Sequence, residues 1–296
     1  MVDLFELATE RVVVGDGAMG TELQRAGLPI GENGDHWSIA HPDRLRAIHE
    51  AYIEAGSDVI LTNSFGANRW VLGRYGLGTE VETVNRAAAK VARQAAGAGI
   101  CVLGDIGPCG GFLRPLGDVD PDALSAEYTR QARALLDGGA DGLIIETMSA
   151  IEELVIAIQA ARAAGAPRIV ASMAFDRLQN GTIRTMMGVA PEKAAAVSLE
   201  AGADIVGANC GTHMTTSDFA EVVRAFRGVT DRPVMVQANA GSPELVDGRA
   251  VYGLTPEAFA TGMSDVVAAG AGIVGGCCGT TPAHVRALAK QIKRGS

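Results

Sequence analysis

Short runs of β-branched and other apolar residues alternate along the chain with longer segments rich in alanine, leucine and charged side chains. The apolar runs predict eight strands, at residues 12–16, 58–63, 101–105, 142–146, 169–175, 204–210, 233–238 and 272–277. The segments between and after them predict eight helices, at about residues 43–55, 80–97, 121–137, 150–164, 191–201, 216–227, 255–268 and 282–293. Strands that alternate with helices of this length are typical of βαβ units and a parallel sheet.

The eight strand–helix pairs indicate an α/β fold, the (β/α)8 TIM barrel, with residues 1–296 as a single domain. A repeated turn supports this interpretation, because Gly56, Gly139, Gly202 and Gly270 each stand between an expected helix and the next strand. Glycine is favoured there since the residue that ends a helix often adopts a left-handed conformation. An open doubly wound sheet with a small second domain is the alternative, but no linker or change of composition divides the chain.

Composition and charge argue against some classes of function. The chain has 48% hydrophobic and 20% charged residues, which is enough apolar material for a large core. Its formal net charge is −9 and no run of Lys or Arg exceeds two residues, so we expect no nucleic acid and no membrane surface among its partners. No apolar run is long enough to cross a bilayer, and the N-terminus lacks the pattern of a signal peptide. We therefore expect a cytoplasmic protein.

Polar side chains stand at the carboxyl ends of the expected strands, the face of a (β/α)8 barrel that carries the active site. In chain order they are Asp16, Asn63, Asp105, Glu146, Cys210, Gln237 with Asn239, and Cys277 with Cys278. Polar or metal-binding residues at so many strand ends predict an active-site mouth. Any single carboxylate among them could equally cap a helix or form a turn.

The cysteines are five in number and two are adjacent, which disfavours a disulfide framework. Cys210 ends the sixth expected strand, and Cys277 and Cys278 end the eighth. In a closed barrel these ends face one pocket, where three thiolates could hold Zn²⁺ with a fourth position free, as catalytic zinc sites do. The alternative is that all three are small buried side chains packed among glycines. Cys101 and Cys109 are expected to serve packing or a loop only.

The motifs around these residues resemble those of the homocysteine S-methyltransferase family, in order from about residue 10 to residue 293. They read Gly-Asp-Gly-Ala-Met-Gly-Thr at 15–21, Thr-Asn-Ser-Phe at 62–65, Ile-Glu-Thr at 145–147, Gly-Ala-Asn-Cys at 207–210, Asn-Ala-Gly at 239–241 and Gly-Gly-Cys-Cys-Gly at 275–279. That family includes betaine–homocysteine methyltransferase, S-methylmethionine-dependent enzymes and the homocysteine-binding module of cobalamin-dependent methionine synthase. The resemblance implies a zinc-dependent S-methyltransferase that methylates the sulfur of homocysteine and gives methionine.

The resemblance also implies substrate-binding residues. Asp16 and Glu146 match the positions that bind the homocysteine amine, and the backbone N–H groups of Gly17 and Ala18 are implied in binding its carboxylate. Asn239 is expected to shape the pocket. The alternative for Asp16 is a turn-forming role before glycine, and for Glu146 a favourable charge near a helix N-terminus.

The methyl donor is less clearly indicated. Trp37 and Phe65 fall where betaine-using relatives place two residues of an aromatic cage for a quaternary ammonium group. Gly66 and Thr147 stand where those relatives carry tyrosines, so the cage is incomplete. Other segments look closer to the cobalamin-linked module, whose donor here would be a separate corrinoid protein. Betaine, S-methylmethionine and a corrinoid-borne methyl group therefore all remain open as donors.

Zn²⁺ as the cofactor would suit this chemistry, because coordination deprotonates a thiol whose free pKa is about 8.5. Three alternatives stay open. The acceptor could be a thiol other than homocysteine. The cysteines could form a structural or storage zinc site, with His213 as a fourth ligand. The barrel could bind phosphate after the eighth strand, although an aldolase version is disfavoured because all the lysines lie in expected helices.

Overall fold

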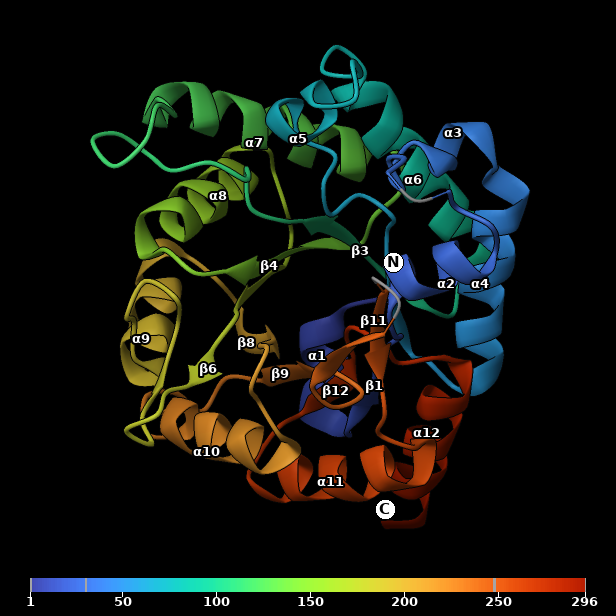
Figure 1. Ribbon diagram of the computed structural model, residues 1–296, viewed down its shortest axis with the longest axis vertical. Coiled ribbons are helices and arrows are strands. Elements are labelled where there is room, and N and C mark those ends of the chain that lie inside the picture. The colour runs from blue at the N-terminus through green and yellow to red at the C-terminus, as the bar shows by residue number, and fades with distance from the viewer. Residues whose placement is uncertain (1, 30, 247–248, 296) are drawn as a thin grey trace.

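The computed structural model describes residues 2–29, 31–246 and 249–295. Eight parallel strands form one sheet that curves into a barrel, with helices on the outside (Figure 1). The strands are β1 (Val13–Val14), β2 (Val59–Leu61), β3 (Cys101–Ile106), β4 (Gly142–Met148), β5 (Ile169–Met173), β8 (Ile205–Cys210), β9 (Val234–Ala238) and β12 (Ile273–Gly276). Their order around the sheet follows the chain, from β2 round to β12 and β1. The expected (β/α)8 barrel is confirmed.

The helices that follow the strands cover the outer face of the barrel. They are α4 (Pro42–Ala55), α6 (Val81–Ala96), α7 (Pro121–Asp137), α8 (Ile151–Ala163), α9 (Pro191–Ala201), α10 (Thr216–Arg227), α11 (Pro256–Ala268) and α12 (Pro282–Gly295). Five of them begin at proline, whose fixed φ and missing N–H suit the first helical position. The expected positions are confirmed, with ends that differ by a few residues. Across the described part of the chain, no helix combines the length and apolarity that crossing a membrane needs.

Aspartates join the two ends of the sheet, where β1 and β2 meet. The N–H of Asp58 donates to the carbonyl of Val14 at 2.7 Å, and the Asp58 carboxylate accepts from the Val14 N–H at 2.9 Å. Nearer the mouth, the N–H of Leu61 donates to Asp16 Oδ2 at 2.8 Å. Asp16 therefore helps to close the barrel and is held in a fixed orientation by doing so.

The amino-terminal end of the barrel is closed by α1 (Leu4–Glu10), which lies across its centre in Figure 1. The apolar cluster at this end consists of Leu4, Val13, Val59, Cys101, Leu103, Ile144, Val170, Ile205, Met235 and Ile273. Layers of inward side chains of this kind fill the interior of (β/α)8 barrels. The carboxylate of Asp3 caps α1 and accepts three hydrogen bonds from Arg168. The packed interior leaves the opposite, carboxyl-terminal mouth as the place for a ligand.

The repeated turn between helix and strand is confirmed. Gly56, Gly139, Gly202 and Gly270 have φ of 112°, 107°, 111° and 114°, the left-handed region that glycine adopts without steric cost. The carbonyl of each of the last three glycines accepts a hydrogen bond from the Nε of an arginine. Arg93 donates to Gly139, Arg162 to Gly202 and Arg227 to Gly270. The same left-handed glycine turn therefore recurs between helix and strand at the closed end of the barrel.

Several short elements were not predicted, and most of them lie in the loops of the mouth. They are α2 (Met19–Arg25), α3 (Trp37–Ala40), α5 (Arg69–Gly73) and two hairpins, β6 (Asp176–Arg177) with β7 (Ile183–Arg184) and β10 (Pro243–Val246) with β11 (Arg249–Tyr252). Elements of two to seven residues are too short to show a hydrophobic period. These loops supply much of the wall of the site described below.

A fully buried histidine in α4 predicts that the fold loses stability in acid. His49 is inaccessible to solvent and neither ring nitrogen has a hydrogen-bond partner, so burial lowers its pKa to about 4. Between this value and the unfolded value of about 6.5, only the unfolded chain binds the proton, and stability falls as the pH falls. We expect His49→Leu to weaken this fall by about 1 kcal/mol per pH unit. Urea unfolding at pH 7, 6 and 5 measures it; parallel declines for both proteins would contradict the assignment.

Candidate metal centre and active site

The three cysteines at the carboxyl ends of β8 and β12 come together. The Sγ of Cys278 lies 3.9 Å from the Sγ of Cys210 and 3.9 Å from that of Cys277. All three sulfurs lie within 4.8 Å of one another. A tetrahedral zinc ion with Zn–S bonds of about 2.3 Å would place its sulfurs about 3.8 Å apart. The cysteines therefore fit one zinc ion, and the open barrel mouth beside them leaves room for a further ligand.

Left-handed backbone conformations occur at Cys210 and next to the cysteines. Cys210 has φ of +59°, a region that costs a residue with a Cβ about 1 kcal/mol or more, and Gly211 follows it at +81°. Gly279, next to the cysteine pair, has φ of +77°, and a Cβ there would lie 2.1 Å from Cγ of Tyr252. The ring of Tyr252, from β11, therefore packs directly on the Gly279 backbone. Strain held at Cys210 is typical of functional sites.

The three thiols alter one another's pKa. Hydrogen bonds from Cys210 and Cys277 lower the pKa of Cys278 well below that of a free thiol. Hydrogen bonds with Cys210 and Cys278, together with burial, raise the pKa of Cys277. Without a cation, the cluster thus favours one thiolate stabilised by two thiols. A divalent cation would bind most tightly to the fully deprotonated cluster, because the thiolate is the ligand form of cysteine.

Three buried carboxyl groups lie near one another at the barrel mouth: Asp16, Asp105 and Glu146 are 2%, 6% and 8% exposed. Asp105 and Glu146 line the same cavity as the sulfurs. Burial raises the pKa of Asp16 to about 7. Burial, with the nearby Asp16 and Cys210, raises the pKa of Glu146 to about 8. Oε2 of Glu146 and Oδ1 of Asp105 have no hydrogen-bond partner. Buried acids without partners favour a bound positive group, because a cation would offset the cost of their desolvation.

The expected carboxylate-binding turn after β1 is only partly available. The N–H of Ala18 donates to Thr280 Oγ1 at 3.0 Å, and the Ala18 carbonyl accepts from the Tyr52 hydroxyl at 2.9 Å. At Gly17 a Cβ would lie 2.7 Å from Thr280 Oγ1 and 2.8 Å from a ring carbon of Tyr52. Glycine at position 17 therefore allows close packing against Tyr52 of α4 and Thr280, which precedes α12. Ala18 lines the cavity, but its N–H already has an acceptor.

Two asparagines hold the loops that carry the site. Nδ2 of Asn239 donates to the carbonyl of Gly211 at 3.0 Å, which ties the end of β9 to the turn after Cys210. Asn209 accepts from the Thr147 N–H at 3.0 Å and donates to Thr147 Oγ1 at 2.7 Å. Thr147 has φ of +59° and directly follows Glu146. The sequence motifs include Asn209 and Thr147, but no sequence signal reveals that they bond to each other across 62 residues.

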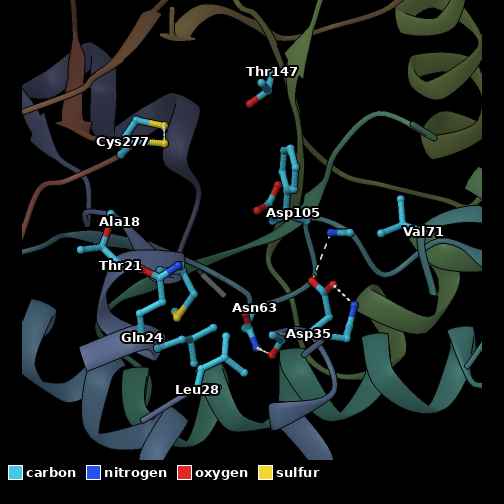
Figure 2. Close-up of a pocket in the computed structure, with 18 of the residues that line it drawn as sticks. Ala18, Thr21, Gln24, Leu28, Asp35, Asn63, Val71, Asp105, Thr147 and Cys277 are labelled. Atoms are coloured by element: carbon cyan, nitrogen blue, oxygen red, sulfur yellow. Dashed lines mark hydrogen bonds between the residues drawn. The ribbon is translucent and has the colours of Figure 1, made fainter. Parts of the chain in front are cut away.

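A cavity of about 470 Å³ extends from the sulfurs toward α2 and the loop at residues 33–35. Figure 2 shows Cys277 on one side of it, and Asp35, Asn63 and Asp105 on the other. Phe65 lines this cavity and is 41% exposed. Trp37 is only 3% exposed and lines a separate pocket of about 260 Å³ beside α3. The two aromatic residues expected at the donor site are therefore not brought together in one cavity.

A structural zinc site and a phosphate site find little support in the geometry. Among the described residues, the group placed to share a metal ion comprises Cys210, Cys277 and Cys278 alone, without His213. Thr280 is fully buried and its hydroxyl donates to the carbonyl of Cys277 at 2.7 Å, so it offers little to a phosphate. A closed four-ligand site that uses His213 and a phosphate cradle after β12 are thus both disfavoured.

Comparisons with known proteins agree with this geometry. The model of the homocysteine S-methyltransferase family matches residues 13–292. The chain belongs to the homocysteine S-methyltransferase family. Its relatives include methionine synthase of Mycobacterium tuberculosis, 35% identical over 304 residues, and that of Mycobacterium leprae, 35% identical over 306 residues. These matches cover 98% and 99% of the chain but 25% of each relative, so this member of the family spans a quarter of their length.

Solved structures of the homocysteine methyltransferase MmuM from Escherichia coli share the fold of this family member. The metallated form is 24% identical with a TM-score of 0.78, over 97% of this chain and 98% of the other. The oxidized form is 26% identical with a TM-score of 0.74, over 96% of each chain. The family resemblance inferred from the motifs is thereby confirmed.

Proposed function

We propose that this chain is a homocysteine S-methyltransferase that forms methionine, with Cys210, Cys277 and Cys278 as ligands of Zn²⁺. The observation that carries the proposal is the group of three sulfurs within 4.8 Å of one another, at the wall of a cavity that also contains buried acids. Family membership supports homocysteine as the acceptor. We further propose that residues 1–296 act as one homocysteine-binding barrel domain, and that it works in the cytoplasm, where its five free cysteines would stay reduced.

When bound, zinc would supply a thiolate form of homocysteine at neutral pH without a protein base. The remaining work of the chain is to hold the amino acid and to align its sulfur with the methyl group. In the transfer, the sulfur forms a bond to the methyl carbon while the bond from that carbon to the donor breaks. The electron pair of the broken bond stays with the donor, and the thiol proton goes to solvent.

The ammonium group of homocysteine would bind to Asp16 and Glu146. Both are buried, and Asp16 and Cys210 lie near enough to Glu146 to contribute to its raised pKa. A bound ammonium provides the positive charge that these acids otherwise lack, so it favours their ionised forms. Asp16 is already oriented by its bond from Leu61, whereas Oε2 of Glu146 is free to accept. Asn239 would keep Cys210 in place through Gly211.

The carboxylate of homocysteine requires N–H donors rather than a basic side chain. Among the described residues that line the cavity there is no Lys, Arg or His. Ala18, which follows Gly17, and the start of α2 line the same cavity as the sulfurs. We propose that the carboxylate binds along this stretch, with the Ala18 N–H recruited only if its bond to Thr280 opens.

The direct test is methionine formation by the zinc-loaded chain from homocysteine and each of three donors: glycine betaine, S-methylmethionine and methylcobalamin. We expect methionine from at least one donor, and no methylation of cysteine or glutathione under the same conditions. Methylation of those thiols with homocysteine left unchanged would overturn the proposed acceptor. No methylation of any thiol by any donor, in a chain shown to bind zinc, would overturn the proposed function.

A further inference from the structure

A second cavity, of about 310 Å³, lies between the loop that follows β3 and the first turns of α8. Figure 1 shows the segment between β3 and α7 extending beside α8. The lining of this cavity shares no described residue with the lining of the cavity beside the sulfurs. The second cavity, the α8 groove, is therefore a separate place for a ligand. Its apolar walls include Phe112, Leu113, Leu116, Pro121, Ile156 and Met187.

Hydrogen bonds hold the walls of the α8 groove. In the loop after β3, the N–H of Val119 donates to the carbonyl of Phe112 at 3.1 Å, and the N–H of Arg114 donates to the carbonyl of Val119 at 3.0 Å. On the opposite side, Thr185 Oγ1 donates to the carbonyl of Ser149 at 2.8 Å, which joins the loop after β5 to the chain just before α8. The groove is therefore formed before any ligand binds, which lowers the entropy cost of binding.

A buried carboxylate lies in this mostly apolar groove. Glu153 lines the groove and is 8% exposed. Its Oε1 accepts from the Tyr128 hydroxyl and from the Cys109 N–H, each at 2.7 Å. Its Oε2 has no hydrogen-bond partner among the described residues. A largely buried carboxylate oxygen without a donor is costly, so it favours a ligand that brings an N–H group to it.

The other charged groups of the α8 groove favour a cation. Glu152 also lines the groove, and both glutamates stand in the first turn of α8, where the helix dipole stabilises negative side chains. The basic side chain of the described lining is Arg114, whose Nη1 is already paired with Asp120 Oδ2 at 3.1 Å. An anion in the groove would be repelled by two carboxylates, whereas an ammonium group would be attracted to both.

We propose that the α8 groove binds a small molecule that carries a primary ammonium group on an apolar chain, with Glu153 as the residue that binds the ammonium. The three N–H donors of such a group suit the open oxygen of Glu153 and the neighbouring Glu152. The chain lies along the apolar wall, and a volume of about 310 Å³ is at the lower end of the range for small-molecule sites. The inference does not depend on methyl transfer, because the groove contains none of the residues assigned to zinc or homocysteine.

Three compounds with the same five-carbon chain test this chemistry. Pentylamine carries an ammonium group on the chain, hexanoate carries a carboxylate, and L-norleucine carries both. In calorimetric titrations of the zinc-loaded chain without a methyl donor, we expect pentylamine to bind and hexanoate not to bind. Binding of norleucine beside pentylamine assigns the groove to amino acids, and binding of pentylamine alone assigns it to amines.

Methyl-labelled methionine locates the bound compound in the same protein. Met187 lines the α8 groove, whereas Met19 lines the cavity beside the sulfurs. We expect pentylamine to shift the NMR methyl signal of Met187 and to leave that of Met19 in place. The two signals are assigned from the variants Met187→Leu and Met19→Leu.

Glu153→Gln removes the charge but keeps an oxygen that can accept the two hydrogen bonds of Oε1. We expect the affinity for pentylamine to fall about 10- to 100-fold. Glu146→Gln is the matched control, because it removes a buried carboxylate from the other cavity, and it should bind pentylamine as the native chain does. Phe112→Ala changes a side chain that is 51% exposed, so the fold should persist while the affinity falls about 3- to 10-fold.

Four results would each overturn the inference: no binding of pentylamine, binding of hexanoate as tight as that of pentylamine, a shift of the Met19 signal alone, or equal pentylamine affinity in the native chain and Glu153→Gln. None of these measurements uses methyl transfer. Failure of the α8 groove as a site is therefore distinguishable from failure of the proposed function, which the methionine assay tests.

Discussion

Replacement of Cys278 by alanine is expected to abolish zinc binding and methyl transfer together. Cys278 is the central sulfur of the group, 3.9 Å from each of the other two. Without it only two sulfur ligands remain, too few for the three-ligand arrangement of a catalytic zinc site. Both the thiolate and its alignment with the methyl carbon are lost, so we expect the rate to fall by about 10³-fold or more. Elemental analysis of the purified variant, together with the methionine assay, measures both effects.

A matched control is available in the same chain. Cys101 is 1% exposed and packs in the apolar cluster at the closed end of the barrel, away from the mouth. Cys101→Ala should therefore retain zinc and activity and lose only some stability. Circular dichroism should show helical content in both variants, because the described core of the barrel consists of apolar packing. Full activity in a zinc-free Cys278→Ala protein would refute the metal-centred account.

Substitution of Glu146 by glutamine is expected to weaken homocysteine binding by about 100-fold, read as a rise in the homocysteine KM. The glutamine keeps the shape of the side chain but removes the charge that meets the substrate ammonium. Charged hydrogen bonds of this kind contribute about 1.5–3 kcal/mol, which corresponds to about 10- to 150-fold in affinity. The effect should be near the upper end, because Glu146 is 8% exposed and solvent screens it little. Steady-state kinetics at varied homocysteine measure it.

A thiol without an amino group provides the internal control for that variant. With 2-mercaptoethanol as the acceptor, the native chain and Glu146→Gln should react at similar low rates, since there is no ammonium to hold. The donor KM should also stay the same, because Glu146 is assigned to the acceptor. If Glu146→Gln slowed both thiols equally, Glu146 would act on the sulfur or on the fold, and its assignment to the substrate amine would fail.

The barrel could be predicted from the sequence because its determinants are local and repeated. The apolar runs place the strands, and glycine at positions such as 56 and 202 marks the helix ends with φ above 110°. The sulfur group was predictable for a related reason: Cys210 and the pair at 277–278 stand at the ends of parallel strands, and the fold brings such ends to one mouth.

The finer geometry of the site depends on contacts between distant loops, which local patterns do not encode. The bond from Ala18 N–H to Thr280 joins residues 262 apart and occupies a donor expected to bind substrate. The burial of Trp37 away from the cavity follows from the packing of α3, an element of four residues. Asp105 could be placed at a strand end, but its free oxygen becomes visible only when every neighbour is known.

X-ray absorption at the zinc edge tests the central claim most directly. The measurement compares the number of sulfur atoms around the ion before and after addition of homocysteine. We predict three sulfurs in the resting protein, from Cys210, Cys277 and Cys278, and four once the substrate thiol has bound. A shell that already contains four protein ligands and does not change with homocysteine would contradict the account, because the substrate sulfur would then have no place on the metal.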